Sequence, residues 1–310
     1  MITTRAHART ATRISRACRH LNHQGLCRPP GAQGGAVNRL ERAVDDVDPG
    51  LSVRLRALKL RLRHDVARRL IQDKVGPGEV CVDVGANRGV YTHIMSVQVG
   101  SGGHVHAVEP FPANYERLHT LARRRGNVIV HTLALSDHSG SALLHFPIHD
   151  GHPIDALASL ERNGTQNQDS SLVPLSTLDE LLEGERRVSF VKCDVEGHEQ
   201  RVFDGAASIL GRDRPVVFAE VEQRHREDPI ENTFAFFASA GYRGWFVAKG
   251  RLRPLEEFDV VRHQLGFLGD RFIPYAMPDG YIYDFLFCPP GTMPPPWSLG
   301  RHERQDGPAE

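Results

Sequence analysis

The chain has 310 residues, of which 40% are hydrophobic and 25% are charged, and its 38 basic and 38 acidic residues give a formal net charge of zero. These proportions are ordinary for a soluble globular protein, and the length accommodates one large α/β domain or two small ones. Without a net charge no overall field attracts the protein to nucleic acid or to a membrane, and no apolar run approaches the roughly 20 residues that span a bilayer.

Residues 1–50 differ in composition from the rest of the chain. Arginines recur among Ser, Thr, Ala, Gly and Pro with no acid before Glu41. A transit peptide, a nucleic-acid-binding arm, a disordered leader and a start codon assigned too far upstream would all have this composition. A secretory signal is disfavoured because the segment has no apolar core. We expect a dispensable, disordered basic leader.

The five cysteines are Cys18, Cys27, Cys81, Cys193 and Cys288. Their number is odd, and two of them lie within predicted buried strands. We therefore expect core thiols in a reducing, cytoplasmic compartment and no disulfide framework. Cys18 and Cys27 have histidines between them, but the spacing matches no zinc motif, so we expect no metal there.

Residues 51–75 are alternately basic and apolar. The apolar residues of Val53–Leu62 hint at the alternation of a strand, whereas those from Val66 onward have helical spacing. We expect a helix over His64–Lys74 that packs at the edge of a sheet. Gly76-Pro77-Gly78 then turns the chain into the first strand.

The central motif begins with Val80–Val84, a β-branched apolar run that is typical of a strand buried on both faces. The loop Gly85–Gly89 follows at once, and Val90–Met95 can open a helix. Such a strand, glycine turn and helix present backbone N–H groups to a ligand outside the carboxyl end of the strand. An ordinary strand-to-helix turn without a ligand would have the same composition.

The spacing in this loop argues against a dinucleotide. The G-x-G-x-x-G fingerprint, started at Gly85, needs glycine where Asn87 and Val90 stand, and no Walker A sequence follows. The loop suits a small zwitterionic group, because an acid can attract its ammonium and the loop amides its carboxylate. The residues predicted to bind it are Asp83, Gly85, Ala86, Asn87 and Gly89.

A second strand, His104–Val108, ends at Glu109-Pro110, and Asn114–Arg124 has the composition of a helix. An acid at the end of the second strand is placed to accept hydrogen bonds from both ribose hydroxyls. A loop for an amino-acid group and an acid for a ribose together indicate S-adenosylmethionine. We assign Glu109 and Pro110 to this cofactor site.

A third strand is predicted over Val128–Leu135, followed by Ser136-Asp137, where Asp137 can cap its own turn. Ala142–Phe146 can form a short added strand. Pro147–Pro174 is the least patterned segment, and a loop of this length is either functional or disordered. We expect it to cover the substrate.

The predicted fourth strand, Val188–Gly197, is the central one and carries a cluster of charged residues at its end: Lys192, Asp194, Glu196, His198 and Glu199. Crowded carboxylates repel one another unless a lysine, a sulfonium or a divalent metal offsets them, which makes the cluster a site candidate. A metal is the weaker option because the order of residues matches no metal motif. Asp194 or His198 would act as general base, whereas Glu199 more simply begins the next helix.

The remaining elements follow in order. We expect a capping box at Thr177 and Glu180 before a short helix, a helix over Glu199–Leu210, a fifth strand over Pro215–Glu222, a helix over Asn232–Ala240 closed by Gly241, a strand over Tyr242–Leu252 that turns at Lys249-Gly250, and a last strand over Tyr281–Cys288. The fifth strand again ends in acids, so Glu220 is a candidate for the substrate pocket and His225 a weaker one.

Four blocks of this sequence resemble the FkbM family of class I S-adenosylmethionine-dependent methyltransferases: Asp83–Gly89, Val108–Asn114, Ala134–Asp137 and Lys192–Glu199. They occur in the family's order and span roughly residues 77–289. The resemblance does not cover the first fifty or the last twenty residues.

The resemblance implies an α/β, Rossmann-like fold with a seven-stranded, mostly parallel sheet, an antiparallel edge strand and helices on both faces. It implies a methyltransferase domain over residues 51–290, followed by a tail, residues 291–310, that we expect to be disordered. It also places Ser136 and Asp137 beside the adenine of the cofactor, where Asp137 can accept from the exocyclic amine.

The predicted function is methyl transfer from S-adenosylmethionine to a hydroxyl of a sugar or secondary metabolite. The residues assigned to catalysis are Lys192, Asp194, Glu196 and His198. We expect a small-molecule acceptor and neither a nucleic-acid nor a membrane partner; the oligomeric state is open. Two rival functions are an NAD(P)-dependent oxidoreductase on a Rossmann-like sheet and a non-catalytic RNA-binding module whose basic leader holds the RNA.

Overall fold

The computed structural model describes residues 48–62, 65–149, 152–154, 157–161, 168–268 and 278–299. The predicted leader up to residue 47, with Cys18 and Cys27, lies outside the described residues, as does the tail beyond residue 299. In the described part Cys81, Cys193 and Cys288 are free and buried, as expected for core thiols.

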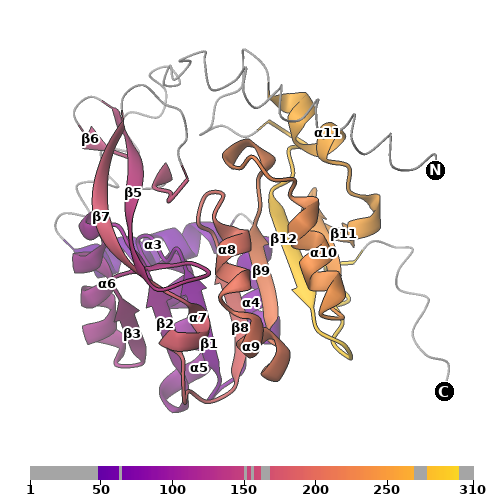
Figure 1. Ribbon diagram of the computed structural model, residues 1–310. Helices are drawn as coiled ribbons and strands as arrows, with labels where there is room; N and C mark the ends of the chain where they lie inside the picture. The colour runs from indigo at the N-terminus through magenta and orange to yellow at the C-terminus, as the bar shows by residue number, and fades with distance from the viewer. Residues whose placement is uncertain are drawn as a thin grey trace, which may run out of the picture.

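The main sheet has eight strands in the order β11-β10-β12-β9-β8-β1-β2-β3 (Figure 1). Their bounds are β1 Val80–Val84, β2 His104–Val108, β3 Val128–His131, β8 Val188–Cys193, β9 Val216–Glu220, β10 Arg243–Ala248, β11 Arg251–Pro254 and β12 Asp284–Cys288. The five strands from β3 to β9 are mutually parallel, and β12 is antiparallel to β9. The Rossmann-like class I arrangement is therefore confirmed.

The predicted count of seven strands is wrong by one, because the chain turns back after β10 and adds β11. Lys249 and Gly250 both have positive φ, 50° and 73°, as the tightest hairpin turns require. The turn at Lys249-Gly250 is at the predicted position.

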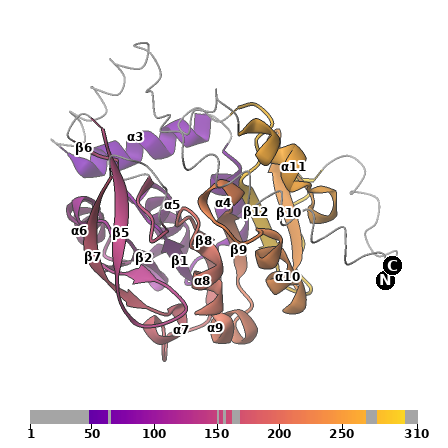
Figure 2. The same ribbon diagram turned by 45° about the horizontal axis from the view of Figure 1, so that its top comes forward.

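The described helices are α3 Pro49–Leu62, α4 Val66–Lys74, α5 Val90–Val99, α6 Pro112–Arg125, α7 Leu178–Leu181, α8 Glu199–Asp204, α9 Ala207–Arg212, α10 Glu231–Ser239 and α11 Val260–His263. Short 3₁₀ turns lie at Gly100–Gly102, Gln223–His225, Leu255–Glu257 and Leu265–Phe267. Helix α3 packs on α5 and α6 (Figure 2). The strand suggested by the alternating residues of Val53–Leu62 is therefore wrong, because this segment is part of helix α3. One side of the helix is buried.

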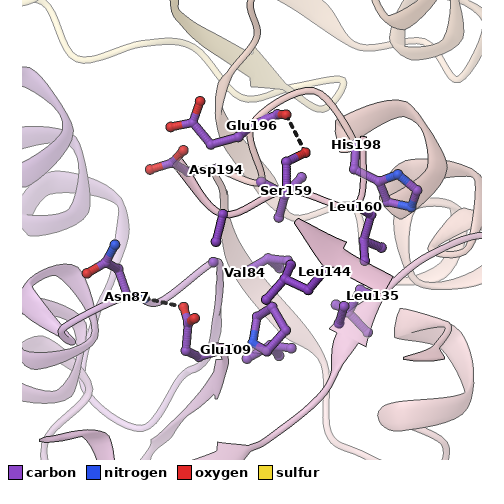
Figure 3. Close-up of a pocket in the computed structure, with 16 residues that line it drawn as sticks. Val84, Asn87, Glu109, Leu135, Leu144, Ser159, Leu160, Asp194, Glu196 and His198 are labelled. Carbon is purple, nitrogen blue, oxygen red and sulfur yellow. Dashed lines mark hydrogen bonds between the residues drawn. The ribbon is translucent and has the colours of Figure 1, made fainter. Parts of the chain in front are cut away.

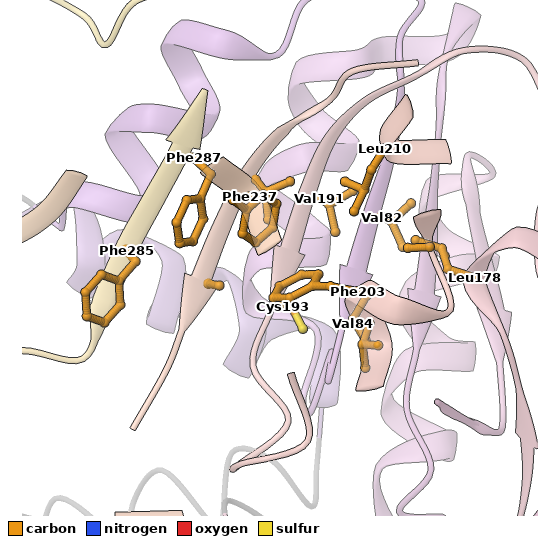
Figure 4. Close-up of a cluster of buried hydrophobic side chains, with 14 of the residues drawn as sticks. Val82, Val84, Leu178, Val191, Cys193, Phe203, Leu210, Phe237, Phe285 and Phe287 are labelled. Carbon is orange, nitrogen blue, oxygen red and sulfur yellow. The ribbon is translucent and has the colours of Figure 1, made fainter. Parts of the chain in front are cut away.

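Helices cover both faces of the sheet, as predicted, because successive residues of a strand point to opposite sides. On β1, Cys81 packs with α4 and α5, while Val80, Val82 and Val84 face α8 and α9. Phe203 of α8 and Phe237 of α10 lie edge to face at 4.8 Å in the second of these cores (Figure 4). The sheet is thus packed between two apolar layers.

A second, four-stranded sheet stands beside the first, in the order β4-β7-β5-β6. Its strands are β4 Ala134–Leu135, β5 Gly140–His149, β6 His152–Pro153 and β7 Gln168–Ser176. Two predictions fail here. The single strand expected over Val128–Leu135 is divided between the two sheets, and the loop expected over Pro147–Pro174 contains β6 and most of β7, which pairs with β5.

The single helix predicted over Glu199–Leu210 is also wrong, because it breaks between α8 and α9 at Gly205. A Cβ on Gly205 would lie 2.1 Å from the carbonyl oxygen of Ser136, so the chain needs glycine for this close approach. By contrast, the capping box is confirmed, since the Thr177 side chain accepts from Glu180 N at 3.0 Å. Gly241, with φ of 81°, closes α10 as predicted.

The folded part of the chain extends past residue 290, where disorder was expected. Ser298 and Leu299 are buried, and Leu252 N of β11 donates to Ser298 O at 2.6 Å. The Arg69 guanidinium lies over the Trp297 ring, 3.7 Å from its centroid. Residues 291–299 therefore pack against β11 and α4. Within the described residues, the helices are all too short or too polar to traverse a bilayer.

Candidate active site

A cavity opens at the carboxyl ends of β1, β2 and β8 and is closed on its other side by the second sheet (Figure 3). Its lining combines acids and amides from the main sheet with apolar residues from the second: Val84, Gly85, Asn87, Val108, Glu109, Pro110, Ala134, Leu135, Leu144, Ala158, Ser159, Leu160, Asp194, Val195, Glu196 and His198. It is open to solvent, and the space free of protein atoms, counted together with the solvent at its mouth, is about 590 Å³.

The loop after β1 is tied to two neighbouring strands. Gly85 N and Ala86 N both donate to Val108 O at 3.0 Å, which anchors the loop to the end of β2. Gly85 has φ of 73°, and a Cβ there would lie 1.8 Å from Asp194 O. Asn87 also has positive φ, 48°. Of the predicted loop residues, Gly85 and Asn87 line the cavity, whereas Ala86 is packed in the core.

Gly89 is the N-terminal cap of α5, with φ of 80°, and does not line the cavity. A Cβ there would lie 2.9 Å from Leu118 Cδ2 of α6. Its contribution is to let α5 start close to α6, which fixes the direction of the loop.

Glu109 enters the cavity from the end of β2 with both carboxylate oxygens held. Oε2 accepts from Asn87 N at 2.7 Å, drawn as a dashed line in Figure 3, and Oε1 accepts from Phe111 N at 2.8 Å. Glu109 is buried in this arrangement, with only 5% of the residue exposed. These two amides fix the orientation of the carboxylate at the end of β2.

Asp83 lies beneath the loop rather than in the cavity lining. Its Oδ2 accepts from Thr92 Oγ1 at 2.5 Å, while Oδ1 is buried and has no hydrogen-bond partner among the described residues. Burial raises the pKa of Asp83, and the positive charge of Lys192 opposes the increase. Asp83 is 1% exposed and lies outside the cavity lining, so the contact that it makes is with Thr92 of α5.

Lys192 is the positive centre of the acids at the strand ends. Its Nζ lies 3.1 Å from Asp194 Oδ2 and 3.7 Å from Glu220 Oε1. Burial by itself lowers the pKa of Lys192, but the charges of Asp194 and Glu220 outweigh burial, and the net shift is upward. Lys192 is therefore an ammonium at neutral pH and cannot serve as a base.

The other acids near Lys192 titrate abnormally. Burial first, and then the charge of Asp194, raise the pKa of Glu220 well above its ordinary value. Burial and the charge of Asp65 raise the pKa of Asp284 to about 7. Burial thus favours the protonated forms of these two acids.

Glu196 lines the cavity from a strained loop that joins β8 to α8. Its φ is 52°, and Gly197 has φ of 106° with its α-carbon packed on His225. Glu196 Oε2 lies 2.8 Å from His225 Nε2. Burial lowers the pKa of His225, but the carboxylates of Glu196 and Glu222 outweigh it and raise the value to about 9, so the imidazolium holds Glu196 in place.

His198 lines the cavity, but both of its ring nitrogens are engaged. Nε2 lies 3.0 Å from Ser136 Oγ, and Nδ1 lies 2.8 Å from Glu161 Oε1. A histidine with two such partners is held in position and is poorly placed to accept a proton from a substrate. Ser136 is itself buried behind it.

Asp137 is not part of the cavity lining. Its Oδ2 accepts from Arg201 Nη1 at 2.6 Å, and its Oδ1 from Ser136 and His138. Neither Ser136 nor Asp137 lines the cavity, and these partners of Asp137 are side chains and not the backbone of its own turn.

Sequence reasoning missed the wall that the second sheet supplies. Leu144 comes from β5, and residues 158–160 come from the segment expected to be a loop. Ser159 Oγ donates to Glu196 O at 2.7 Å, the second dashed line in Figure 3, and so joins the two walls. The only available signal was the position of this segment after the third strand, which suggested a substrate cover but no particular residue.

Comparisons with known proteins identify the family of this chain. Residues 83–243 match a family described as the methyltransferase FkbM domain. Among solved structures, a methyltransferase FkbM of Methylobacillus flagellatus KT matches at 15% identity and a TM-score of 0.43, over 89% of this chain and 59% of that one. The present chain thus spans less than two thirds of that relative.

Two further solved structures are similar at a comparable level. Aeropyrum pernix fibrillarin, in complex with natively bound S-adenosyl-L-methionine, matches at 15% identity and a TM-score of 0.41, over 74% of each chain. A SAM-dependent O-methyltransferase of Thermotoga maritima matches at 13% identity and a TM-score of 0.36, over 72% of this chain and 63% of that one. A search of curated proteins found no relative.

Proposed function

Because the chain belongs to the FkbM family of S-adenosylmethionine-dependent methyltransferases, we propose that it methylates a hydroxyl group of a small molecule, such as a sugar or a secondary metabolite. The observation that carries the proposal is the cavity in which the clamped carboxylate of Glu109 and the strand-end carboxylate of Asp194 belong to one lining. Family membership speaks against the oxidoreductase and the non-catalytic module.

The residues present fit the methyl donor. Glu109 offers two fixed acceptor oxygens for the ribose hydroxyls, and Leu135, Leu144 and Leu160 form an apolar wall suited to a base. We assign the donor's ammonium group to the loop after β1, from which Gly85 and Asn87 line the cavity. S-adenosylmethionine supplies an electrophilic methyl group when bound.

The protein's part is then to position the acceptor. Orientation of a bound reactant contributes roughly 7–11 kcal/mol, whereas general-base assistance of about 10²–10⁴-fold corresponds to roughly 3–5 kcal/mol. We assign orientation of the acceptor hydroxyl, and acceptance of its proton, to Asp194, whose side chain is 28% exposed to the cavity side. Lys192 keeps this carboxylate in place, and Glu196, held by His225, adjoins it.

The charge at this end of the cavity favours a small neutral or cationic acceptor over nucleic acid. The carboxylates of Asp194 and Glu196 line the cavity, whereas Lys192, which pairs with Asp194, does not. A negative potential of this kind repels phosphates. The hydroxyl groups of sugars, in contrast, donate hydrogen bonds to carboxylate oxygens.

The function can be tested with S-adenosylmethionine that carries a labelled methyl group. The protein is incubated separately with a small-molecule extract and with RNA, and labelled products are identified by mass spectrometry. We expect label in the small-molecule fraction, in a methyl ether. Label confined to RNA would reject the small-molecule acceptor, and label on nitrogen or carbon would reject the hydroxyl.

Asp194→Asn tests the assigned role in the same assay. We expect turnover to fall by about 10²-fold or more, as for loss of a general base, with donor affinity changed less than threefold by calorimetry. Asp204→Asn, an exposed acid on α8, is the matched control and is expected to behave as the wild type. Unchanged turnover in Asp194→Asn would remove Asp194 from catalysis.

A further inference from the structure

Two histidines and a glutamate converge at the edge of the sheet opposite to the cavity. The Nε2 atoms of His104 and His106 lie 2.8 and 3.2 Å from the same oxygen, Oε2 of Glu185. The three ligand atoms all lie within 4.8 Å of one another. This cluster has no part in the function proposed above.

The topology explains why these residues meet. His104 and His106 are two positions apart on β2, so their side chains leave the same face of the strand. Glu185 precedes β8, which is separated from β2 only by β1, and Val80 of β1 pairs with both His104 and Val188. The amino ends of the three strands therefore bring the glutamate over the two rings.

We propose that His104, His106 and Glu185 bind a divalent transition-metal ion, with Zn²⁺ as the best match. Two imidazoles and one carboxylate form a known type of zinc ligand set, in which the fourth position is open to solvent. The side chains of His104 and Glu185 are 20% and 18% exposed, so an ion can enter from solvent. A zinc ion lies about 2.0–2.2 Å from each of its ligand atoms. The three ligand atoms are already so close to one another that only small shifts would bring them to these distances from a shared ion.

Of the two neighbouring side chains, one is placed to support such a site and the other would have to move. His131 Nε2 of β3 lies 2.9 Å from His106 Nδ1, where it can accept the proton that this nitrogen carries when Nε2 binds a metal. Arg186 Nη2 lies 3.1 Å from His104 Nδ1 and 3.4 Å from Gly102 O. Since Arg186 can only donate, metal binding by His104 requires its guanidinium to move from the ring to Gly102 O.

The proposed metal site is remote from the cavity. His104 begins β2 and Glu109 follows its end, so at about 3.3 Å per residue the two sites are roughly 16 Å apart along the strand. A metal here would fasten the amino ends of β2 and β8 together. It would stabilise the fold by mass action without entering the cavity.

The test uses the full-length protein, first freed of metal with a chelator and then titrated with Zn²⁺ in a calorimeter. We expect a saturable site with one ion per chain and an increase in Tm of several degrees at an excess of Zn²⁺. Absence of saturable binding would overturn the proposal.

Glu185→Gln separates a metal site from a hydrogen-bonded histidine cluster. Glutamine keeps an oxygen that accepts from both rings but loses the carboxylate charge, so the metal-free Tm should hold while Zn²⁺ affinity falls at least tenfold. His131→Gln should weaken binding by about 10–100-fold, as removal of a supporting partner does. Zinc affinity unchanged in Glu185→Gln would mean that the cluster is hydrogen-bonded only.

His104→Gln/His106→Gln removes two ligands and should abolish the saturable site. The matched control is His119→Gln/His138→Gln, in which the same number of histidines is removed outside the cluster. Any zinc bound by the other histidines and cysteines is common to both variants and cancels in the comparison. Equal zinc binding by the two variants would reject the site.

Discussion

At the scale of single residues, Gly85 couples the loop after β1 to the centre of the sheet. Its positive φ and its contact with the Asp194 carbonyl both exclude a side chain. The same sheet offers a control, because Gly78 has φ of 83° but nothing lies within 4 Å of a Cβ placed there. Substitution of Gly78 therefore tests backbone strain alone, whereas substitution of Gly85 adds a steric clash.

Gly85→Ala is therefore expected to abolish measurable donor binding, while Gly78→Ala retains it. Both variants incur the roughly 1–2 kcal/mol of a left-handed alanine, but only Gly85→Ala forces β1 and β8 apart at the cavity. Calorimetry with S-adenosylmethionine and thermal unfolding measure the two effects. Equal donor affinity in the two variants would show that the contact with Asp194 O has no role in binding.

Glu109 gives a second prediction at this scale. Glu109→Ala should weaken S-adenosylmethionine binding by at least tenfold, since it removes the acceptor for both ribose hydroxyls and frees the amides of Asn87 and Phe111. Glu183→Ala, an exposed acid outside the cavity lining, is the control. Full affinity in folded Glu109→Ala protein would make the ribose assignment wrong.

The residues of the cavity that could be predicted are those next to strand ends. Gly85, Asn87, Glu109 and Asp194 follow runs of apolar residues, and parallel strands bring such positions to one edge of a sheet. Ser159 could not be predicted, because its contact with Glu196 joins segments that share no periodicity.

At the scale of elements, the loop between β8 and α8 is held by a buried acid. Glu199 Oε1 accepts from Gly197 N at 2.9 Å and from Val195 N at 3.4 Å, whereas Oε2 has no hydrogen-bond partner among the described residues. Burial raises the pKa of Glu199 to about 7 from an ordinary value of 4.5. The ionised side chain is thus disfavoured in the fold.

This shift predicts a stability that falls as pH rises. Between about pH 4.5 and 7 the folded protein binds more protons at Glu199 than the unfolded chain does, so the unfolding free energy decreases until both states are ionised. Relative to Glu199→Gln, the wild type should lose up to about 3 kcal/mol between pH 5 and pH 8. Chemical unfolding at the two pH values measures the difference, with Glu183→Gln as control. A difference that does not vary with pH would contradict a raised pKa.

The elements that sequence patterns missed are those created by pairing. β7 is polar and half exposed, so Gln168–Ser176 lacks the signature of a strand and gains its structure from β5. β4 was assigned to the wrong sheet because its apolar residues continue the pattern of β3. The break between α8 and α9 depends on the close approach of Gly205 to Ser136, which local spacing does not encode.

At the scale of the whole molecule, we propose that residues 48–299 form one folding unit. Its two apolar layers share the eight-stranded sheet, and residues 291–299 are packed into one of them. Asp48 belongs to this unit, because its Oδ1 accepts from Leu51 N at 3.0 Å at the start of α3 and pairs with Arg124 at 2.7 Å.

A chain that lacks residues 1–43 keeps Asp48 and should match the full-length protein in Tm and in donor affinity. Thermal unfolding and calorimetry of both chains check this. A gel shift with RNA, run on both, asks whether the basic leader holds nucleic acid. A lower Tm or a weaker donor affinity of the shortened chain would show that the leader is part of the folded enzyme.

The second sheet has a consequence for how such a protein can diversify. One wall of the cavity consists of residues at the strand ends of the main sheet. The other is an arm, formed by the second sheet and residues 158–160, which is inserted between β3 and β8 and is hydrogen-bonded to the first wall through Ser159 and Glu196. We expect that exchanging this arm for that of another protein would change which acceptor molecules bind and would leave the proposed donor site at Glu109 in place. Exchange of this single insertion can thus change the acceptor that such a protein recognises.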